Sequence, residues 1–357
     1  MVFHIGAVEV EEADMRKDFA FFYKDLSFYL REARKTKKIV GWNCGHIPLE
    51  LIIASGMLPS KLINKKGIYD FLILPYRINE VCEDCQLFWV PMRIGNNVPV
   101  IWWNGEFGQL IDILEQASGQ KITKESLHHA IEKMNRMRNI LTRLFKFCEN
   151  GIAEMSDVMQ VCLAVQSVPV DPVMKEVLKL IDRLEQKASE KRNDNHLNGR
   201  YKLLLLAGAL ENYDLEVIKK YERSKCSFVR DISYTGRDFI FHSVNLEGDL
   251  MQNIRKRYSD ATLCTAELPE KVCRTDLNRI LENDGLDGIV LLAEGLFEPF
   301  DAYPDTVKSV VEKKGIPFTK FSPKYIQDSR EVDYIIKDSL NNYRNYRERV
   351  QKEICLP

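Results

Sequence analysis

Three cysteines, whose thiols can bind metal ions, lie within the first 85 residues of this 357-residue chain. Cys44 follows the apolar run Lys38–Trp42, and Cys82 and Cys85 form a CxxC motif. The two thiols of a CxxC lie close enough to bind one metal ion, and cysteine thiolates also hold iron–sulfur clusters. For Cys44 the alternative is a small buried apolar residue. For the CxxC the alternative is a redox pair, although the surrounding sequence has no obvious thioredoxin-like βαβ context.

Two further side chains near Cys44 can move protons. His46 has an imidazole, which titrates near neutral pH. Glu50 lies in the first turn of a predicted helix, where the helix dipole favours a carboxylate for structural reasons alone. The functional alternative for Glu50 is a carboxylate that binds a substrate hydroxyl or transfers a proton. For both residues, the sequence leaves a structural and a functional role open.

A strand and a helix are predicted to position these residues. Lys38–Trp42 has the pattern of a short buried strand, and the helix that follows is opened by Pro48 and closed by Gly56. Cys44 is thereby placed at the carboxyl end of the strand and beside a helix N-terminus. Open α/β sheets bind ligands at this edge, so the location suits a ligand site.

Strands alternate with helices in both halves of the chain. This pattern predicts an α/β protein with two Rossmann- or flavodoxin-like doubly wound parallel sheets and additional helices. The predicted strands are 38–42, 69–74 and 98–103 in the first half, and 202–207, 227–231, 288–292 and 317–321 in the second. The predicted helices are 12–36, 105–116, 124–148, 214–222, 249–258, 274–282, 306–314 and 330–353. After residue 148 the helical pattern continues to about residue 189, with a turn at 169–172.

The polar run 189–199 predicts a domain boundary or an exposed linker. We therefore expect four parts. They are an N-terminal helical segment (1–36), an α/β domain with the candidate cysteines (37–120), a helical connector (121–199) and a second α/β domain with a long C-terminal helix (200–357).

The composition is that of an ordinary globular protein, with 45% hydrophobic and 29% charged residues. The net charge of −1 gives no reason to expect a nucleic-acid or anionic-membrane partner, and no apolar run is long enough to span a bilayer. The acidic N-terminus lacks the pattern of a signal peptide. Nine cysteines without such a signal predict reduced thiols or metal ligands in the cytoplasm.

Other conspicuous residues have simpler explanations. Arg237 suits either a CoA phosphate or an acidic partner. The chain contains no GxxxxGK[ST] motif for ATP and no GxGxxG after a strand for a dinucleotide. We expect Cys148, Cys162, Cys226 and Cys355 to be structural, Trp102, Trp103 and Phe107 to be core, and Arg136, Arg138 and Arg143 to form a solvated helix face.

Segment 38–59 and several later motifs resemble the family of 2-hydroxyacyl-CoA dehydratase and ATP-dependent benzoyl-CoA reductase subunits. The opening segment has the pattern Gly-aromatic-x-Cys-x-(Tyr/His)-x-Pro-x-Glu-(Leu/Ile)-Ile-x-Ala-x-Gly-(Met/Leu)-x-Pro. The resemblance covers most of residues 37–350. Its later motifs are Leu114-Glu115 with Ile122–Glu125, Leu203–Gly208 with Asp214, Asp231–Arg237, Asp287–Val290, Phe297–Pro299 and Gly315–Pro317.

The resemblance implies a [4Fe-4S] cluster with Cys44 as one ligand and either Cys82 or Cys85 as another. The third ligand of the family is a cysteine in a Cys-Asp-Pro loop, where this chain has Phe297, and phenylalanine cannot coordinate iron. Three alternatives follow: both Cys82 and Cys85 are ligands, Cys264 or Cys273 supplies the third thiolate, or the cluster is absent.

The resemblance implies a lyase of the 2-hydroxyacyl-CoA dehydratase type, or a related reductase, that works under anaerobic conditions. It also implies that the chain pairs with a homologous sister subunit. A separate ATP-hydrolysing iron–sulfur activator would supply one electron, and a ketyl formed from the acyl-CoA thioester would expel the 2-hydroxyl as water. Glu50 and His46 would orient substrate or handle protons. One rival is a non-catalytic partner subunit that has lost its full ligand set, and another is a metallocluster reductase acting on a different small substrate. The acyl group, and whether the dimer is homomeric or heteromeric, stay open.

Overall fold

The described residues form two four-stranded sheets, and every strand pair in both is parallel. The computed structural model describes residues 17–42, 47–62, 69–75, 99–103, 105–190, 197–207, 210, 212–233, 235–240, 242–260, 281, 285–292, 311, 313–321 and 329–354. Parallel strands with intervening helices confirm the predicted α/β class.

The first sheet has the strand order β2-β1-β3-β4. Its strands are β1 (Ile39–Trp42), β2 (Leu58–Lys61), β3 (Phe71–Pro75) and β4 (Val100–Trp103). All four residues of β1 are buried, as expected for a parallel sheet covered on both faces. β2 was not predicted because Pro59 weakens its strand pattern. It lies at the sheet edge, where a proline is tolerated.

The second sheet repeats this order as β6-β5-β7-β8. Its strands are β5 (Tyr201–Ala207), β6 (Cys226–Ser233), β7 (Gly288–Leu292) and β8 (Phe318–Phe321). Gly288 is required where β7 meets the helix α15 (Ser329–Ile354), because a Cβ atom there would collide with the Tyr343 ring. In both sheets the chain leaves the first strand on one side and returns to add the third strand on the other, an order compatible with a doubly wound fold.

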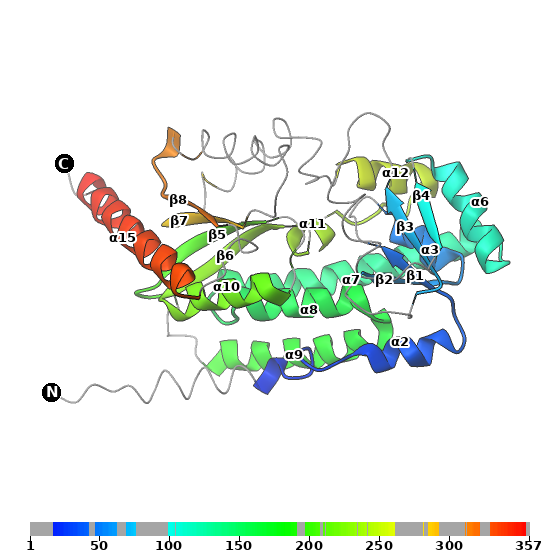
Figure 1. Cartoon of the computed structure of the whole chain (residues 1–357), viewed down its shortest axis with the longest axis horizontal. Helices are drawn as coiled ribbons and strands as arrows, with labels where there is room; N and C mark the ends of the chain where they lie inside the picture. The colour runs from blue at the N-terminus through cyan, green and yellow to red at the C-terminus, as the bar shows by residue number, and fades with distance from the viewer. Residues whose placement is uncertain are drawn as a thin grey trace.

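Two central helices run side by side and contact strands of both sheets (Figure 1). They are α7 (Lys124–Glu149) and α8 (Met155–Ser167), and α9 (Val170–Glu190) packs on their far side with α2 (Ser27–Arg34). The helix α12 (Leu250–Asp260) comes from the second half of the chain but lies beside the first sheet (Figure 1). Other helices within the described residues include α3 (Leu49–Ala54), α6 (Phe107–Ser118), α10 (Asn212–Arg223) and α11 (Arg237–Ile240).

The helix that follows β1 has the predicted ends. Pro48 is the N-cap of α3 with extended backbone, and Gly56 follows the last turn with φ of 81°, in the left-handed region that glycine adopts readily. Further along the chain, α7 begins with a capping box in which Thr123 and Ser126 bond each other's backbone N–H groups. Both helices lie where the sequence predicts them.

The prediction of one helix over residues 12–36 is wrong. Residues 17–19 are helical, residues 20–24 form turns, and α2 begins only at Ser27. The Asp25 carboxylate accepts the backbone N–H of Ser27 at 2.9 Å and its hydroxyl at 2.7 Å, a turn that directly precedes α2, whose N-cap is Leu26. Residues 12–16 and most of the predicted helices 274–282 and 306–314 lie outside the described residues.

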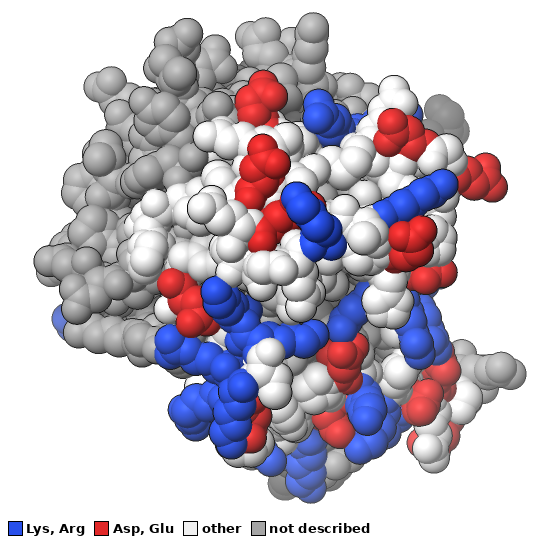
Figure 2. Space-filling model, turned by 90° about the vertical axis from the view of Figure 1, so that its right-hand side faces the viewer, with Lys and Arg blue, Asp and Glu red and all other residues white. Residues whose placement is uncertain are grey.

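The surface near α6 and α2 carries both signs of charge. Figure 2 shows basic and acidic residues interspersed there, with basic residues more frequent in the lower half. Several are paired, including Lys35 with Glu32 at 2.8 Å and Arg34 with Asp70 at 3.4 Å. Among the helices that the structure describes, none has the length and apolar character needed to cross a membrane.

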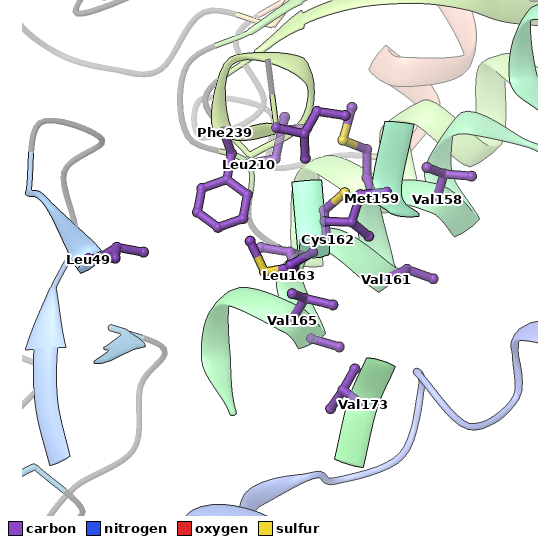
Figure 3. Packing of buried hydrophobic residues seen from close by; sticks show 14 of the residues in the cluster. Leu49, Val158, Met159, Val161, Cys162, Leu163, Val165, Val173, Leu210 and Phe239 are labelled. Atoms are coloured by element: carbon purple, nitrogen blue, oxygen red, sulfur yellow. The ribbon is translucent and has the colours of Figure 1, made fainter. Parts of the chain in front are cut away.

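One large apolar cluster connects the two sheets with the central helices. Figure 3 shows Met159, Cys162 and Leu163 of α8 among apolar side chains that include Phe239 of α11 and Leu210. The cluster also contains Leu49 at the start of α3. A second, smaller cluster lies at the second sheet and includes Leu204, Leu206 and Ile289.

Candidate functional site

The strands that lead to the predicted metal ligands are neighbours in the first sheet. β1 ends at Trp42, two residues before Cys44, and β3 ends at Pro75, ahead of Cys82 and Cys85. The chain adds β2 on one side of β1 and β3 on the other, so the strand order reverses between β1 and β3. Open α/β sheets bind ligands at such a point. Outside the described residues lie Cys44, His46, Cys82, Cys85, Cys264, Cys273, Phe297 and Cys355.

Glu50 lies in the first turn of α3 with 0% of its surface exposed. Its Oε1 accepts a hydrogen bond from Arg138 Nη2 at 2.6 Å, and its Oε2 accepts one from the Tyr258 hydroxyl at 2.6 Å. Arg138 belongs to α7 and is itself only 1% exposed. The carboxylate therefore joins three helices from three different parts of the chain.

The surroundings of Glu50 favour its charged form. Burial is the largest single influence and raises the pKa of Glu50, but the charges of Arg138 and Arg257 and the hydrogen bonds from Tyr258 and Arg138 together hold that pKa below its ordinary value. Burial, followed by the charge of Glu50, raises the pKa of Tyr258. The pair thus consists of a carboxylate and a neutral phenol near neutral pH.

The same phenol completes the N-terminus of α3. The Leu49 N–H donates to the Tyr258 hydroxyl oxygen at 3.0 Å, so that α12 supplies an acceptor that Pro48 cannot provide. Tyr258 therefore accepts from the backbone of the helix and donates to its first-turn carboxylate. The arrangement fixes the helix that follows the Cys44 segment in the sequence.

Further hydrogen bonds fix the segment around Val244 and α12, in the second half of the chain, near α7. Asn135 donates to the Val244 carbonyl at 2.7 Å and accepts the Val244 N–H at 2.9 Å. Arg257 donates to the carbonyls of Phe239 and His242, both at 3.1 Å, and lies over the Tyr258 ring at 4.5 Å. These contacts fix the positions of the groups that surround Glu50.

The assignment of Arg138 to a solvated helix face is wrong, whereas Arg136 and Arg143 are not buried. A signal was present in the sequence. Arg138 follows Met134 by four residues and precedes Leu141 by three, so it lies on the buried stripe of α7. A basic residue on an apolar stripe indicates a buried acidic partner.

A second polar junction joins the carboxyl end of β2 to the second half of the chain. Lys61 Nζ donates to Thr235 Oγ1 at 3.0 Å, and Thr235 Oγ1 also accepts the Leu210 N–H at 2.8 Å. Gln166 of α8 donates to the Thr235 carbonyl at 2.8 Å. This junction is buried, like the Glu50 network.

The turn after β6 is organised by a buried carboxyl group. Asp231 Oδ2 accepts from the Ser233 hydroxyl at 2.9 Å and from the Arg237 N–H at 3.0 Å, whereas Asp231 Oδ1 is buried without a hydrogen-bond partner among the described residues. Burial raises the pKa of Asp231 from 3.8 to about 6. Arg237 lies 3.5 Å from Glu149, which agrees with the acidic-partner alternative.

The indole of Trp42 has an unusual environment at the end of β1. Its side chain is 3% exposed, and its Nε1 is buried with no hydrogen-bond acceptor in the part of the chain that the structure describes. An unmade hydrogen bond in a buried site costs about 1–3 kcal/mol. Such an orphaned donor, two residues before Cys44 in the sequence, suits an anionic or hydrogen-bond-accepting group.

The burial of the described cysteines agrees with the structural role that the sequence predicts for them. Cys148, Cys162 and Cys226 are buried. Burial raises the pKa of each thiol, in the case of Cys226 to about 12, so all three are protonated at neutral pH and poorly suited to metal binding. Within the described ranges, no three His, Cys, Asp or Glu side chains form a group that could hold a metal ion.

Comparison with known proteins gives two findings. The family model described as 2-hydroxyglutaryl-CoA dehydratase, D-component, matches residues 76–333. This range includes Cys82 and Cys85 and begins after Cys44. One of the subunits of benzoyl-CoA reductase from Thauera aromatica is 21% identical over 367 residues, which cover 88% of this chain and 93% of the relative.

Proposed function

Because the chain belongs to the 2-hydroxyglutaryl-CoA dehydratase D-component family, we propose that it is a subunit of an acyl-CoA dehydratase or reductase. The family match carries the proposal, and the relative named as a benzoyl-CoA reductase subunit supports it along nearly the whole chain. In more detail, we propose that the enzyme dehydrates or reduces an acyl-CoA thioester by radical chemistry under anaerobic conditions. Its partners would be a homologous sister subunit and an ATP-dependent iron–sulfur activator.

We also propose that Cys44, with Cys82 or Cys85 or both, holds a [4Fe-4S] cluster. When bound, such a cluster supplies one-electron chemistry and an open iron for a substrate oxygen. Support comes from the adjacency of β1 and β3, the strands that precede the two cysteine segments, and from the orphaned Trp42 donor at that edge of the sheet. The same topology supports the proposal that each sheet is the core of a doubly wound unit.

For Glu50 the contacts favour positioning over proton transfer. Both carboxylate oxygens are engaged by Arg138 and Tyr258, and the lowered pKa keeps the group ionised. We propose that Glu50 holds α3 in place, and that His46 is the group near Cys44 available for proton transfer at neutral pH.

Iron and sulfide analysis of the anaerobically purified complex tests the proposal. We expect stoichiometric iron and sulfide in the wild-type protein and a loss of both in Cys44→Ala. Cys226→Ala is the matched control, because its thiol is buried and protonated, and it should retain both. A complex with Cys44→Ala that keeps its full cluster content and activity would contradict the assignment.

A second candidate function is a non-catalytic partner subunit. Phe297 at the position expected for the third ligand favours it, because a phenyl ring cannot bind iron. In that case the purified chain holds no iron, whereas the complete complex is active and Cys44→Ala has no effect on its turnover. The same analysis therefore separates the two candidates.

A further inference from the structure

We infer that the buried carboxyl group of Asp231 acts as a proton-sensitive switch for contacts between the two halves of the chain. The neutral acid keeps the turn after β6 closed around it. Loss of the proton to solvent favours an open turn, in which Thr235 no longer contacts the first half. The switch needs neither a cluster nor a substrate, so it is independent of the proposed function.

The first observation is the unequal use of the two carboxyl oxygens. Asp231 is 1% exposed, and its Oδ2 accepts from the Ser233 hydroxyl at 2.9 Å and from the Arg237 N–H at 3.0 Å. Its Oδ1 is buried and has no partner among the residues that the structure describes. Burying a charge costs more than burying a neutral polar group. A bare buried oxygen therefore suits a neutral acid better than a carboxylate.

The charges around the turn do not compensate for this burial. Among the described residues, the charged or titratable groups there are Lys61 of β2, Cys148 and Glu149 of α7, Cys162 of α8, Arg230 of β6 and Arg237 of α11. Both thiols are neutral, because burial raises their pKa values. Arg237 lowers the pKa of Asp231, but burial is the larger influence and raises it from 3.8 to about 6.

The second observation is that the turn contacts several elements of the fold. Thr235 Oγ1 accepts from Lys61 Nζ of β2 at 3.0 Å and from the Leu210 N–H at 2.8 Å. The Thr235 carbonyl accepts from Gln166 of α8 at 2.8 Å. A movement of the turn therefore affects the first sheet and a central helix together.

The neighbouring helix α11 extends these contacts to β1. Phe239 of α11 stacks on Trp42, with ring centroids 6.1 Å apart and an interplanar angle of 12°. Phe239 and Leu210 belong to the same buried apolar cluster, as Figure 3 shows. The segment that follows Asp231 is thus joined to two strands of the first sheet.

The third observation is that the turn packs closely against the carboxyl group. The Gly236 N–H donates to Ser233 Oγ at 3.0 Å, and this hydroxyl in turn donates to Asp231. A Cβ atom at Gly236 would collide with Asp231 Oδ2 and with the Met159 side chain of α8. The carboxyl group therefore cannot gain further donors, or water, without a movement of the turn.

Ionisation of Asp231 shifts the turn toward the open state. In an open turn water reaches the carboxyl group, so its pKa returns to about 3.8, whereas the closed turn holds it at about 6. The closed turn thus binds the proton more tightly, and opening becomes easier as the pH rises through 6. With these two values, the opening equilibrium increases about tenfold between pH 5 and pH 7.

Hydrogen exchange measured from pH 5 to pH 8 on the full-length chain tests the switch. The reporters are the amides of Leu210, Gly236 and Arg237, each of which donates to a side-chain oxygen of the turn. Their protection factors, corrected for the intrinsic effect of pH on exchange, measure the opening of the turn. Infrared difference spectra detect the protonated carboxyl group independently.

In the wild type, we expect these protection factors to fall about tenfold from pH 5 to pH 7, while the infrared band of a protonated carboxyl group disappears. Asp231→Asn cannot ionise, so it should lack both changes. Ser233→Ala removes a donor that stabilises the carboxylate, so it should move the transition to higher pH.

Asp249→Asn is the matched control. Asp249 also accepts a backbone N–H, that of Gln252 at 3.1 Å, but its side chain is exposed. This variant should keep the wild-type pH profile of the turn.

Two results would overturn the inference. One is a wild-type protein with the same protection factors at pH 5 and pH 7. The other is an Asp231→Asn protein that keeps the wild-type fall, because a different group would then be titrating. Ser233→Ala keeps the test decisive if Asp231→Asn does not fold, since an unchanged transition in that variant also contradicts the assignment.

Discussion

Glu50 shows how one buried charge depends on its neighbours. Its two oxygens accept from Arg138 and Tyr258, and no part of the carboxylate reaches solvent. A buried ion pair contributes little compared with two well-packed apolar residues, but removing one partner strands the other charge. The effect of a substitution at this site therefore depends mainly on whether a buried charge remains without its counter-ion.

Glu50→Gln should destabilise the protein by about 3–5 kcal/mol, because Arg138 then remains charged and buried without its counter-ion. Urea denaturation measures the change. The control is Arg143→Gln, which breaks the exposed ion pair with Glu185 and should cost less than about 1 kcal/mol. Equal effects of the two variants would show that the Glu50–Arg138 pair does not stabilise the fold.

Asp231 should make stability depend on pH in the acidic range. Its pKa is raised from 3.8 to about 6 in the folded protein, so the folded state binds more protons than the unfolded state between these values. The contribution is fully present below pH 3.8 and is lost as the pH rises through 6, with a total on the order of 3 kcal/mol.

Asp231→Asn should remove this contribution. Thermal unfolding followed from pH 4 to pH 7 should then show a smaller decrease in stability with rising pH than the wild type shows. Identical pH profiles for the two proteins would mean that Asp231 does not carry the raised pKa.

At the scale of elements, α3 shows what sequence could predict. Pro48 and Gly56 are local signals, and they placed both ends of the helix. The residues that fix the helix could not be inferred from local signals. Tyr258 lies in a distant segment, and the place of Arg138 on the buried stripe of α7 indicates an acidic partner without identifying it. Cys44, Cys82 and Cys85 remain predictions, since the described part of the chain does not include them.

Tyr258→Phe tests the connection between α12 and α3. The change removes the acceptor of the Leu49 N–H and a donor to Glu50, and we expect a loss of about 1–3 kcal/mol. Hydrogen exchange should become faster at the Leu49 amide. Tyr334→Phe is the control, because that side chain is 71% exposed and its loss should change neither quantity. Unchanged exchange at Leu49 in Tyr258→Phe would contradict the capping role.

At the scale of the molecule, the two sheets share one apolar cluster. The larger apolar cluster includes residues of both sheets and of α7, α8 and α9. The polar contacts of Glu50 and Lys61 also cross between the halves of the chain. The four-part domain division drawn from sequence remains a prediction, but its two α/β parts share a core.

We therefore expect the two halves to unfold together. All four tryptophans lie before residue 104, so their fluorescence reports on the first half, whereas far-ultraviolet circular dichroism reports on helices throughout. The two signals should give one urea midpoint. Lys61→Met removes the hydrogen bond to Thr235 that joins the two halves, so it should lower the common midpoint without separating the two signals. Two separated transitions in the wild type would contradict the shared core.

The cap on α3 also affects how the protein is made. The Leu49 amide and the Tyr258 hydroxyl are 209 residues apart in the chain. At a synthesis rate of about 5–20 residues per second, Tyr258 is added to the nascent chain about 10–40 s after Leu49. The start of α3 cannot reach its final form on the ribosome before then. We therefore expect the start of α3 to reach its final form only after the second half of the chain has been synthesised.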